Sequence, residues 1–215
     1  SYTGYIKFTE ARPMPEAKVP AKPVEMPKVG DHPVLDFLNT VVRVDGELVD
    51  LFQSDNDVRR WLARAGFAAD TAAAAKLEPT DLLETARHLR MAIRTEVERR
   101  KRGEQNPGVL NVFFSLTRSY PMLIPDKDGR LRLERRWDWE RLMPEQMLAP
   151  LMESVADLMV TGDFDRIKHC ENEACVLWFY DRTRSHHRRW CSPAMCGNRH
   201  KVASYRRRRG SGSEA

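Results

Sequence analysis

Four cysteines in two pairs have the residue type and the spacing for metal chemistry. They are the only cysteines among 215 residues, with four residues inside each pair and fifteen between the pairs. The set is Cys170, Cys175, Cys191 and Cys196. Two short-range pairs joined by a loop bring four thiolates to the corners of a tetrahedron, at Zn–S distances of about 2.3 Å. The spacing therefore predicts one structural zinc ion, in preference to two disulfides or four unrelated thiols.

The cysteines lie in the basic part of the chain. Between Arg166 and Arg209 there are twelve Lys or Arg and three acidic residues, which gives this segment a net charge of +9. The other residues have 24 basic and 28 acidic side chains, or −4, and the sum is the +5 of the whole chain. A positive patch on a metal-stabilised module favours nucleic-acid binding, because each neutralised phosphate releases counterions. We therefore expect double-stranded DNA as the partner.

The donor-rich side chains of this segment are the candidate DNA contacts. Asn198 and Arg199 have the chemistry for bidentate contacts to adenine and guanine edges. Alternatively, Asn198 hydrogen-bonds the cysteine sulfurs or caps the turn, and Arg199 braces the fold against Asp181. We expect most of the basic side chains to contact phosphates and thereby position the protein without selecting a sequence. The candidate set is Arg182, Arg184, His186, His187, Arg188, Arg189, Asn198, Arg199, Lys201, Arg206, Arg207, Arg208 and Arg209.

Other chemistries fit the sequence less well. A less favoured interpretation is that a histidine takes the place of one cysteine as a zinc ligand. The candidates for this role are His169, His186, His187 and His200. No Ser-His-Asp order, phosphate-binding glycine loop or paired-His motif is found, and four thiolates leave zinc no open position for catalysis. We therefore expect no enzyme. The alternatives that stay open are an RNA-binding or protein-binding zinc module, and a redox or metal sensor whose zinc is released on oxidation.

Two motifs carry a resemblance to known families. The finger segment resembles the CGNR zinc finger of bacterial transcription regulators through Cys170-x4-Cys175, Trp178, Asp181, Arg184 and Trp190-Cys191-x4-Cys196-Gly197-Asn198-Arg199. The upstream part of the chain resembles the ABATE domain. The resemblance lies in Leu35-Asp36-Phe37-Leu38-Asn39-Thr40 and in a Trp61-Leu62 helix that ends at Gly66. The resemblance covers residues 30 to 209 and implies a stress-induced transcription regulator, with an N-terminal sensing or dimerising domain and a C-terminal DNA-binding finger.

Length and composition set the scale of the fold. A chain of 215 residues with 41% hydrophobic content can bury one core and add a small module. No run of eighteen apolar residues and no apolar signal segment is present, so we expect a soluble cytoplasmic protein. Thiols in that reducing compartment bind metals more often than they form disulfides.

The patterns predict an α+β, mainly helical fold in four parts. They are a Pro-rich arm (1–29), a ligand-sensing or dimerisation domain (30–162), the DNA-binding finger (163–209) and a flexible tail (210–215). The N-terminal domain is predicted to be helical with two short β-hairpins. The finger is predicted to be a treble-clef-like zinc-knuckle module with four cysteine ligands that ends in a basic helix. A hinge of only three residues, 161–163, couples the orientation of the finger to the domain before it.

Hydrophobic periodicity, caps and turn residues locate the elements of the N-terminal domain. We expect helices that begin at Pro33, after Ser54, at 71–77, after Thr80, after Asn106-Pro107 and at Pro144. The helix after Pro107 is predicted to end at Pro121. Hairpins are expected at 41–52, around Asp45-Gly46, and at 122–137.

Polar residues inside the first apolar stretch are the candidate effector contacts. They are Asp36, Asn39 and Thr40, with the indole of Trp61 as a possible pocket wall. The structural alternative is that Asn39 and Thr40 cap the first helix and fix the next turn, while Trp61 belongs to the core. Because a single finger makes few DNA contacts, we also expect a homodimer.

Overall fold

The structure, a computed structural model, describes residues 24–67, 82–138 and 143–210. The helices are α1 (Pro33–Leu38), α2 (Asp55–Ala65), α4 (Leu82–Lys101), α5 (Gly108–Leu116), α6 (Pro144–Thr161) and α7 (Asn198–Gly210). The strands are β1 (Val41–Val44), β2 (Glu47–Asp50), β3 (Ser119–Pro125), β4 (Leu131–Trp137), β5 (Ile167–His169) and β6 (Trp178–Tyr180). The predicted helix at 71–77 and the cap at Thr80 lie outside the described residues.

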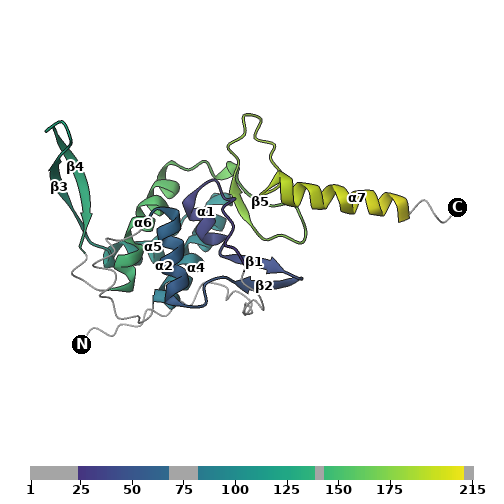
Figure 1. Ribbon diagram of the computed structural model, residues 1–215, viewed down its shortest axis with the longest axis horizontal. Helices are drawn as coiled ribbons and strands as arrows, with labels where there is room; N and C mark the ends of the chain where they lie inside the picture. Colours follow the sequence, from purple (N-terminus) through teal and green to yellow (C-terminus); the bar gives the residue numbers. More distant parts are fainter. Residues whose placement is uncertain (1–23, 68–81, 139–142, 211–215) are drawn as a thin grey trace.

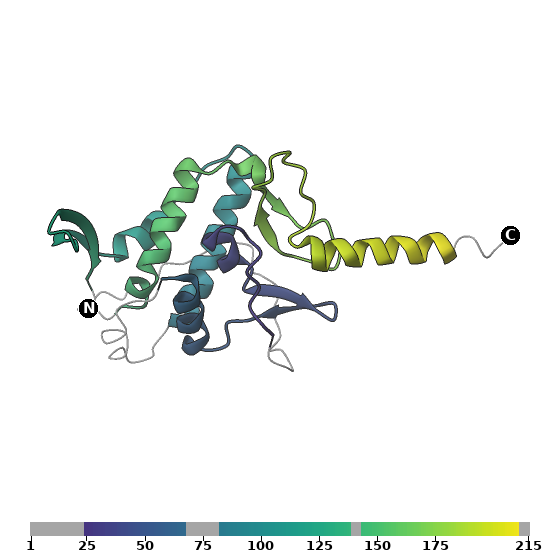
Figure 2. The same cartoon turned by 45° about the horizontal axis from the view of Figure 1, so that its top comes forward.

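The predicted α+β class is confirmed. A helical body lies at the centre, and the hairpin β3–β4 and the helix α7 extend from it in opposite directions (Figures 1 and 2). Within the described ranges, each sheet consists of two antiparallel strands that are consecutive in the chain. In those same ranges, no helix is both long enough and apolar enough to cross a membrane.

The short helix α1 occupies the centre of the body. His32 caps its first turn by accepting a hydrogen bond from Val34 N at Nδ1 (3.2 Å), and Pro33 begins the helix. Val34, Leu35, Phe37 and Leu38 are all fully buried. Because α1 packs against α4, α6 and β6, it contacts both the body and the finger.

The helix α2 has the predicted caps and supplies an aromatic wall to the core. Ser54 accepts a hydrogen bond from Asp57 N, and Gly66 ends the helix with φ 85°. The ring centroid of Trp61 lies 5.1 Å from that of Phe37, and the indole is 4% exposed. Trp61 is therefore mainly a core residue.

A buried ion pair joins the first hairpin to α4. Arg90 donates to both carboxylate oxygens of Asp50 and, at 2.7 Å, to Thr40 Oγ1. Asp50 and Arg90 are each less than 10% exposed. Removing one partner of such a pair would leave a buried charge without a counter-ion, so this pair fixes β2 on α4. The turn before β2 is formed by Asp45 and Gly46, both with positive φ, as predicted.

The helices α4 and α6 complete the core through apolar stripes at helical spacing. Leu89, Ile93 and Val97 of α4 are fully buried, and Met147 and Met152 of α6 are at most 5% exposed. The methionines of α6 therefore belong to the core. The basic end of α4 also has a tertiary contact, because Lys101 Nζ donates to the carbonyl oxygens of Ile167 (2.5 Å) and Phe164 (3.0 Å).

The second hairpin differs from its predicted boundaries. The helix α5 ends at Leu116, and β3 already begins at Ser119, so Pro121 lies inside a strand and does not end the helix. A proline is tolerated there because β3 is an edge strand of a two-stranded sheet. Among the described residues, β3 has no neighbouring strand on its outer side to which the missing N–H could have donated. The hairpin also exposes leucines, with Leu123 at 63%, Leu131 at 68% and Leu133 at 71%.

Candidate metal centre and nucleic-acid interface

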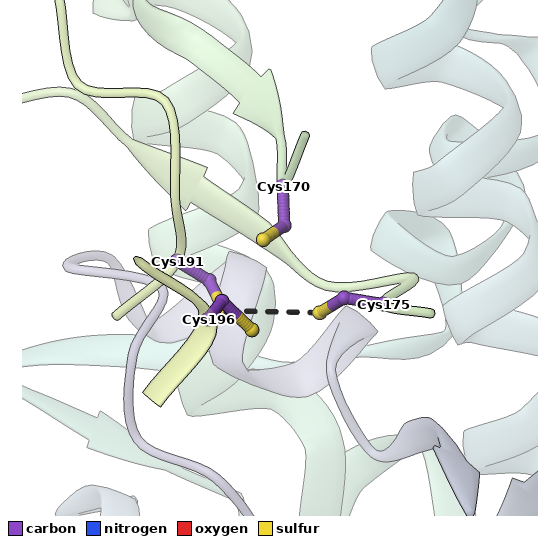
Figure 3. A group of neighbouring side chains, drawn as sticks. All are labelled: Cys170, Cys175, Cys191 and Cys196. Carbon is purple, nitrogen blue, oxygen red and sulfur yellow. Dashed lines mark hydrogen bonds between the residues drawn. The ribbon is translucent and has the colours of Figure 1, made fainter. Parts of the chain in front are cut away.

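The four cysteine sulfurs converge on one point. Their Sγ atoms all lie within 4.8 Å of one another, with 3.8 Å between Cys175 and Cys191 and 3.6 Å between Cys191 and Cys196. Figure 3 shows the four side chains pointing toward a common centre. A tetrahedron with Zn–S distances of about 2.3 Å has edges of roughly 3.8 Å. The sulfur spacing therefore fits a structural zinc ion.

Local backbone geometry positions the first pair. Cys170 directly follows β5, and its N–H donates to the carbonyl oxygen of Leu177 at 2.9 Å. Between the two cysteines, Asn172 forms a tight turn because its side chain accepts from Ala174 N (3.0 Å) and its carbonyl accepts from Cys175 N (2.8 Å). Asn172 thereby directs both thiols to the same side.

The second pair is positioned by the turn η2 (Pro193–Gly197), which runs into α7. Ser192 caps this turn, since its carbonyl accepts from Cys196 N at 2.9 Å and its hydroxyl accepts from Met195 N at 3.3 Å. The two pairs are tied together by a hydrogen bond from Glu171 N to Arg189 O, at 2.9 Å.

The ionisation of the thiols favours a bound cation. Hydrogen bonds from the thiols of Cys175 and Cys191 lower the pKa of Cys170 well below its usual range. The thiols of Cys175 and Cys191 donate hydrogen bonds to the Cys170 sulfur, and this raises their own pKa values. The reason is that a second thiolate would place two negative charges side by side. A divalent ion removes this repulsion, so zinc binding releases protons from the cluster.

Asp181 organises the loop between the two pairs. Its carboxylate is fully buried and accepts from Lys168 Nζ (2.8 Å), Thr183 Oγ1 (2.5 Å) and Arg188 N (2.9 Å). Burial alone would raise the pKa of Asp181, but these hydrogen bonds hold it below its ordinary range. The partner that the sequence suggested for Asp181 was Arg199, and this was wrong: Arg199 is exposed on α7, and Lys168 takes the role.

The finger is docked on the body through a buried asparagine. Asn39 Nδ2 donates to Trp178 O at 2.9 Å, and Asn39 Oδ1 accepts from Trp178 N at 2.8 Å. Trp178 and Ile167 belong to the hydrophobic core of the body, whereas Phe179 packs against the cysteines. The small core under the metal is therefore only part of the packing of the finger, because one face of the hairpin β5–β6 is shared with the body.

Residues 24–31, which we call the strap, pack between α2 and the finger. Val29 contacts the cysteine cluster, and Gly30 O accepts from Tyr180 N at 2.8 Å. Residues 24–29 were assigned to the Pro-rich arm from their composition. The alternation of Val24 and Met26 is the signal that could have identified their packing against the first hairpin.

Arg188 has a structural role that the sequence did not reveal. Its guanidinium pairs with Asp31 and donates to Trp190 O at 2.9 Å, to Val29 O at 3.3 Å and to Cys191 O. The side chain is only 15% exposed. The prediction that Arg188 contacts DNA does not fit this position, since all of these donors bind the protein itself.

The other candidate DNA contacts lie on the surface of the finger. Arg189 is partly engaged by Glu171, at 2.5 Å, and His186 contacts Arg166. The side chains of Arg206, Arg207, Arg208 and Arg209 are outside the described part of α7. The exposed candidates are Arg182, Arg184, His186, His187, Arg189, Asn198, Arg199 and Lys201.

The candidate effector contacts divide into two groups. Asn39 and Thr40 are fully buried, and Thr40 Oγ1 donates to Phe37 O at 2.7 Å while accepting from Arg90. Their hydrogen bonds favour the structural interpretation of both residues. Asp36 and Trp61, in contrast, both line a surface pocket between the strap and α2.

Comparison with family models decides the relationship. The model described as "Putative stress-induced transcription regulator", ABATE, matches residues 31–162. The chain belongs to the ABATE family. The CGNR zinc finger model matches residues 166–209, which contain the four cysteines. A search of curated proteins found no match. The ABATE domain therefore corresponds to the helical body, and the tetra-cysteine cluster is the structural zinc site of a CGNR finger.

Proposed function

We propose that this ABATE-CGNR protein is a transcription regulator that binds double-stranded DNA through its zinc finger and has no catalytic activity. The observation that carries the proposal is the exposed basic surface around a closed tetra-cysteine site. Four thiolates fill a tetrahedral zinc coordination sphere and leave no position for substrate. The remaining chemistry of the finger is cationic, which suits phosphates on the bacterial nucleoid in the cytoplasm.

The helix α7 supports a nucleic-acid partner. It contains thirteen residues and projects away from the body (Figures 1 and 2). Val202 and Tyr205 are about half exposed, at 49% and 53%, so residues 198–205, the part of α7 whose side chains the structure describes, bury no apolar face in the monomer. The sequence of its last turns contains four consecutive arginines, a concentration of positive charge that phosphates would neutralise. A helix of this width also fits the major groove.

The first test is zinc content by mass spectrometry together with a salt series of binding to random duplex DNA. We expect one zinc per chain and an affinity that falls steeply with salt. Zinc without DNA binding would refute the proposed function and leave a structural or protein-contact module. Competition between duplex DNA and structured RNA tests the alternative partner, because an RNA-binding module would retain its RNA under excess DNA.

Individual phosphate contacts are expected to appear in the salt slope. Replacing exposed Lys201 by alanine should weaken binding to all sequences alike and reduce the slope of log K against log salt by about 0.9. Lys127→Ala on the exposed turn of the hairpin β3–β4 is the control, with an unchanged slope expected. Equal slopes for both variants would place Lys201 outside the interface.

We further propose that the regulator is a homodimer in which the hairpins β3–β4 meet. Leu123 and Leu133 are directly paired, and Leu131 lies two residues along the same face. An isolated two-stranded hairpin is marginally stable in water, and a second copy offers the same leucine face around a twofold axis.

Light scattering at micromolar protein tests the dimer. Leu133→Lys should raise the dissociation constant of the dimer by at least about tenfold, because burying a leucine in the interface contributes about 1.5–3 kcal/mol to the free energy of association. Met122→Lys on the opposite face is the matched control, with little effect expected. A monomeric mass for the unaltered chain would contradict the proposal.

A further inference from the structure

A pocket of about 360 Å³ lies between the strap and α2, close to the finger. Its wall includes Pro27, Lys28, Asp31, Asp36, Trp61 and Arg64. Small-molecule sites span about 300–1,000 Å³, so this pocket suits a compact molecule of one or two rings. Pro27, Pro33 and Ala65 provide the apolar part of the wall, together with the edge of the Trp61 indole, which is 4% exposed.

Two cations, Lys28 and Arg64, and two carboxylates, Asp31 and Asp36, line the pocket. Asp31 is paired with Arg188, and Asp36 Oδ1 accepts a hydrogen bond from Gly30 N at 2.8 Å. Arg64 donates to Met26 O within the strap and pairs with Glu25 at 3.8 Å. Lys28 is exposed and attracts the Asp36 carboxylate, but it makes no ion pair within the described part of the chain, so its ammonium group is the cation that a ligand anion would share with Asp36. We propose that this pocket binds a small organic acid with a flat apolar body, held by Lys28, and that the strap transmits its binding to the zinc finger.

The strap is packed too closely to move independently of its neighbours. A Cβ atom on Gly30 would lie 2.8 Å from Asp36 N, so this glycine allows the strap to contact α1 directly. Asp31, the next residue, has φ 54°, a left-handed conformation that is uncommon for a residue with a side chain. A displacement on the pocket side therefore reaches Asp31.

Asp31 connects the pocket to the metal centre through one residue. It pairs with Arg188, and the same guanidinium donates to the carbonyl oxygen of the zinc ligand Cys191. Val29 of the strap also packs against the cysteine cluster. A ligand carboxylate bound to Lys28 would hold the strap in place, keep Arg188 closed over Cys191 and retain the zinc. By linkage, the docked finger then favours the bound ligand to the same extent.

Naphthalene-2-carboxylate is a suitable probe, with 2-naphthylmethylammonium as the analogue of opposite charge. By calorimetry we expect the carboxylate to bind and Lys28→Glu to weaken it about tenfold. Lys127→Glu, a charge reversal on the distant hairpin, should leave the affinity unchanged. Equal binding of the two analogues, no binding of the carboxylate, or an unaltered affinity in Lys28→Glu would overturn the proposed site.

Transmission is tested by the rate of zinc loss to the chelator 4-(2-pyridylazo)resorcinol. Saturating carboxylate should slow zinc loss about fivefold in the unaltered protein and leave the rate unchanged in Asp31→Asn. An identical rate with and without carboxylate in the unaltered protein would refute the transmission. The inference rests on the proposed function, since it names the effector of the regulator. Neither measurement uses DNA, so a failure here is distinct from a failure to bind DNA.

Discussion

Replacing Cys196 by serine is expected to lower bound zinc from one ion per chain to none, and to abolish DNA binding with it. Cys196 lies in the turn η2, just before α7, and its sulfur is 3.6 Å from that of Cys191. Structural zinc contributes about 10–16 kcal/mol to the folding of small metal-dependent modules, more than the packing of this finger can replace. No other single substitution in the chain should have a larger effect.

The unfolding should nevertheless be confined. Ile167 and Trp178 are buried in the core of the body, so the hairpin β5–β6 has contacts that do not depend on the metal. We expect hydrogen exchange to increase across residues 170–177 and 183–210 while α1, α4 and α6 stay protected. This differs from a finger that unfolds as a whole.

Met195→Ser is the matched control for the cysteine variant. Met195 lies in the same turn as Cys196 and is 56% exposed, and it is not part of the cysteine cluster. The control should bind one zinc. Full zinc occupancy in Cys196→Ser would show that three sulfurs suffice and would refute the expected dependence of zinc binding on Cys196.

Replacing Asn39 by alanine is expected to destabilise the protein by about 2–6 kcal/mol, because two buried groups each lose a partner worth about 1–3 kcal/mol. These groups are the backbone N–H and carbonyl of Trp178, which the amide of Asn39 satisfies together. The loss should appear as a lower urea midpoint and as faster exchange at Trp178 and Tyr180.

Asn106→Ala controls for the loss of an asparagine as such. Asn106 is exposed, and within the described residues its side chain accepts a single hydrogen bond, from Gly108 N at 3.4 Å. We expect a change within about 0.5 kcal/mol, as for most surface substitutions. If Asn39→Ala were no more destabilising than this control, the docking of the finger would not depend on the asparagine.

Local signals made much of the fold predictable from the sequence. The cysteine spacing, the Ser54 cap, the Asp45-Gly46 turn and the apolar stripes each act within a few residues. The zinc ligands could be assigned for the same reason, because each pair occupies one turn.

Long-range contacts account for what the sequence did not reveal. Asn39 and Trp178 are 139 positions apart, so no local pattern links them. Arg188 is chemically indistinguishable from the neighbouring arginines, and its burial depends on the strap folding back over the finger. The boundary of β3 was misplaced because a proline normally ends an element, and only the exposed edge of the hairpin tolerates it.

The shared hairpin β5–β6 limits how this finger could spread by gene fusion. A recombination point at residues 163–165 matches the end of the ABATE domain, yet it would separate Trp178 from the asparagine that satisfies its backbone. A finger moved to another host would carry an uncovered tryptophan into solvent. Working chimaeras are therefore expected only when the recipient already provides a surface like α1 and its asparagine.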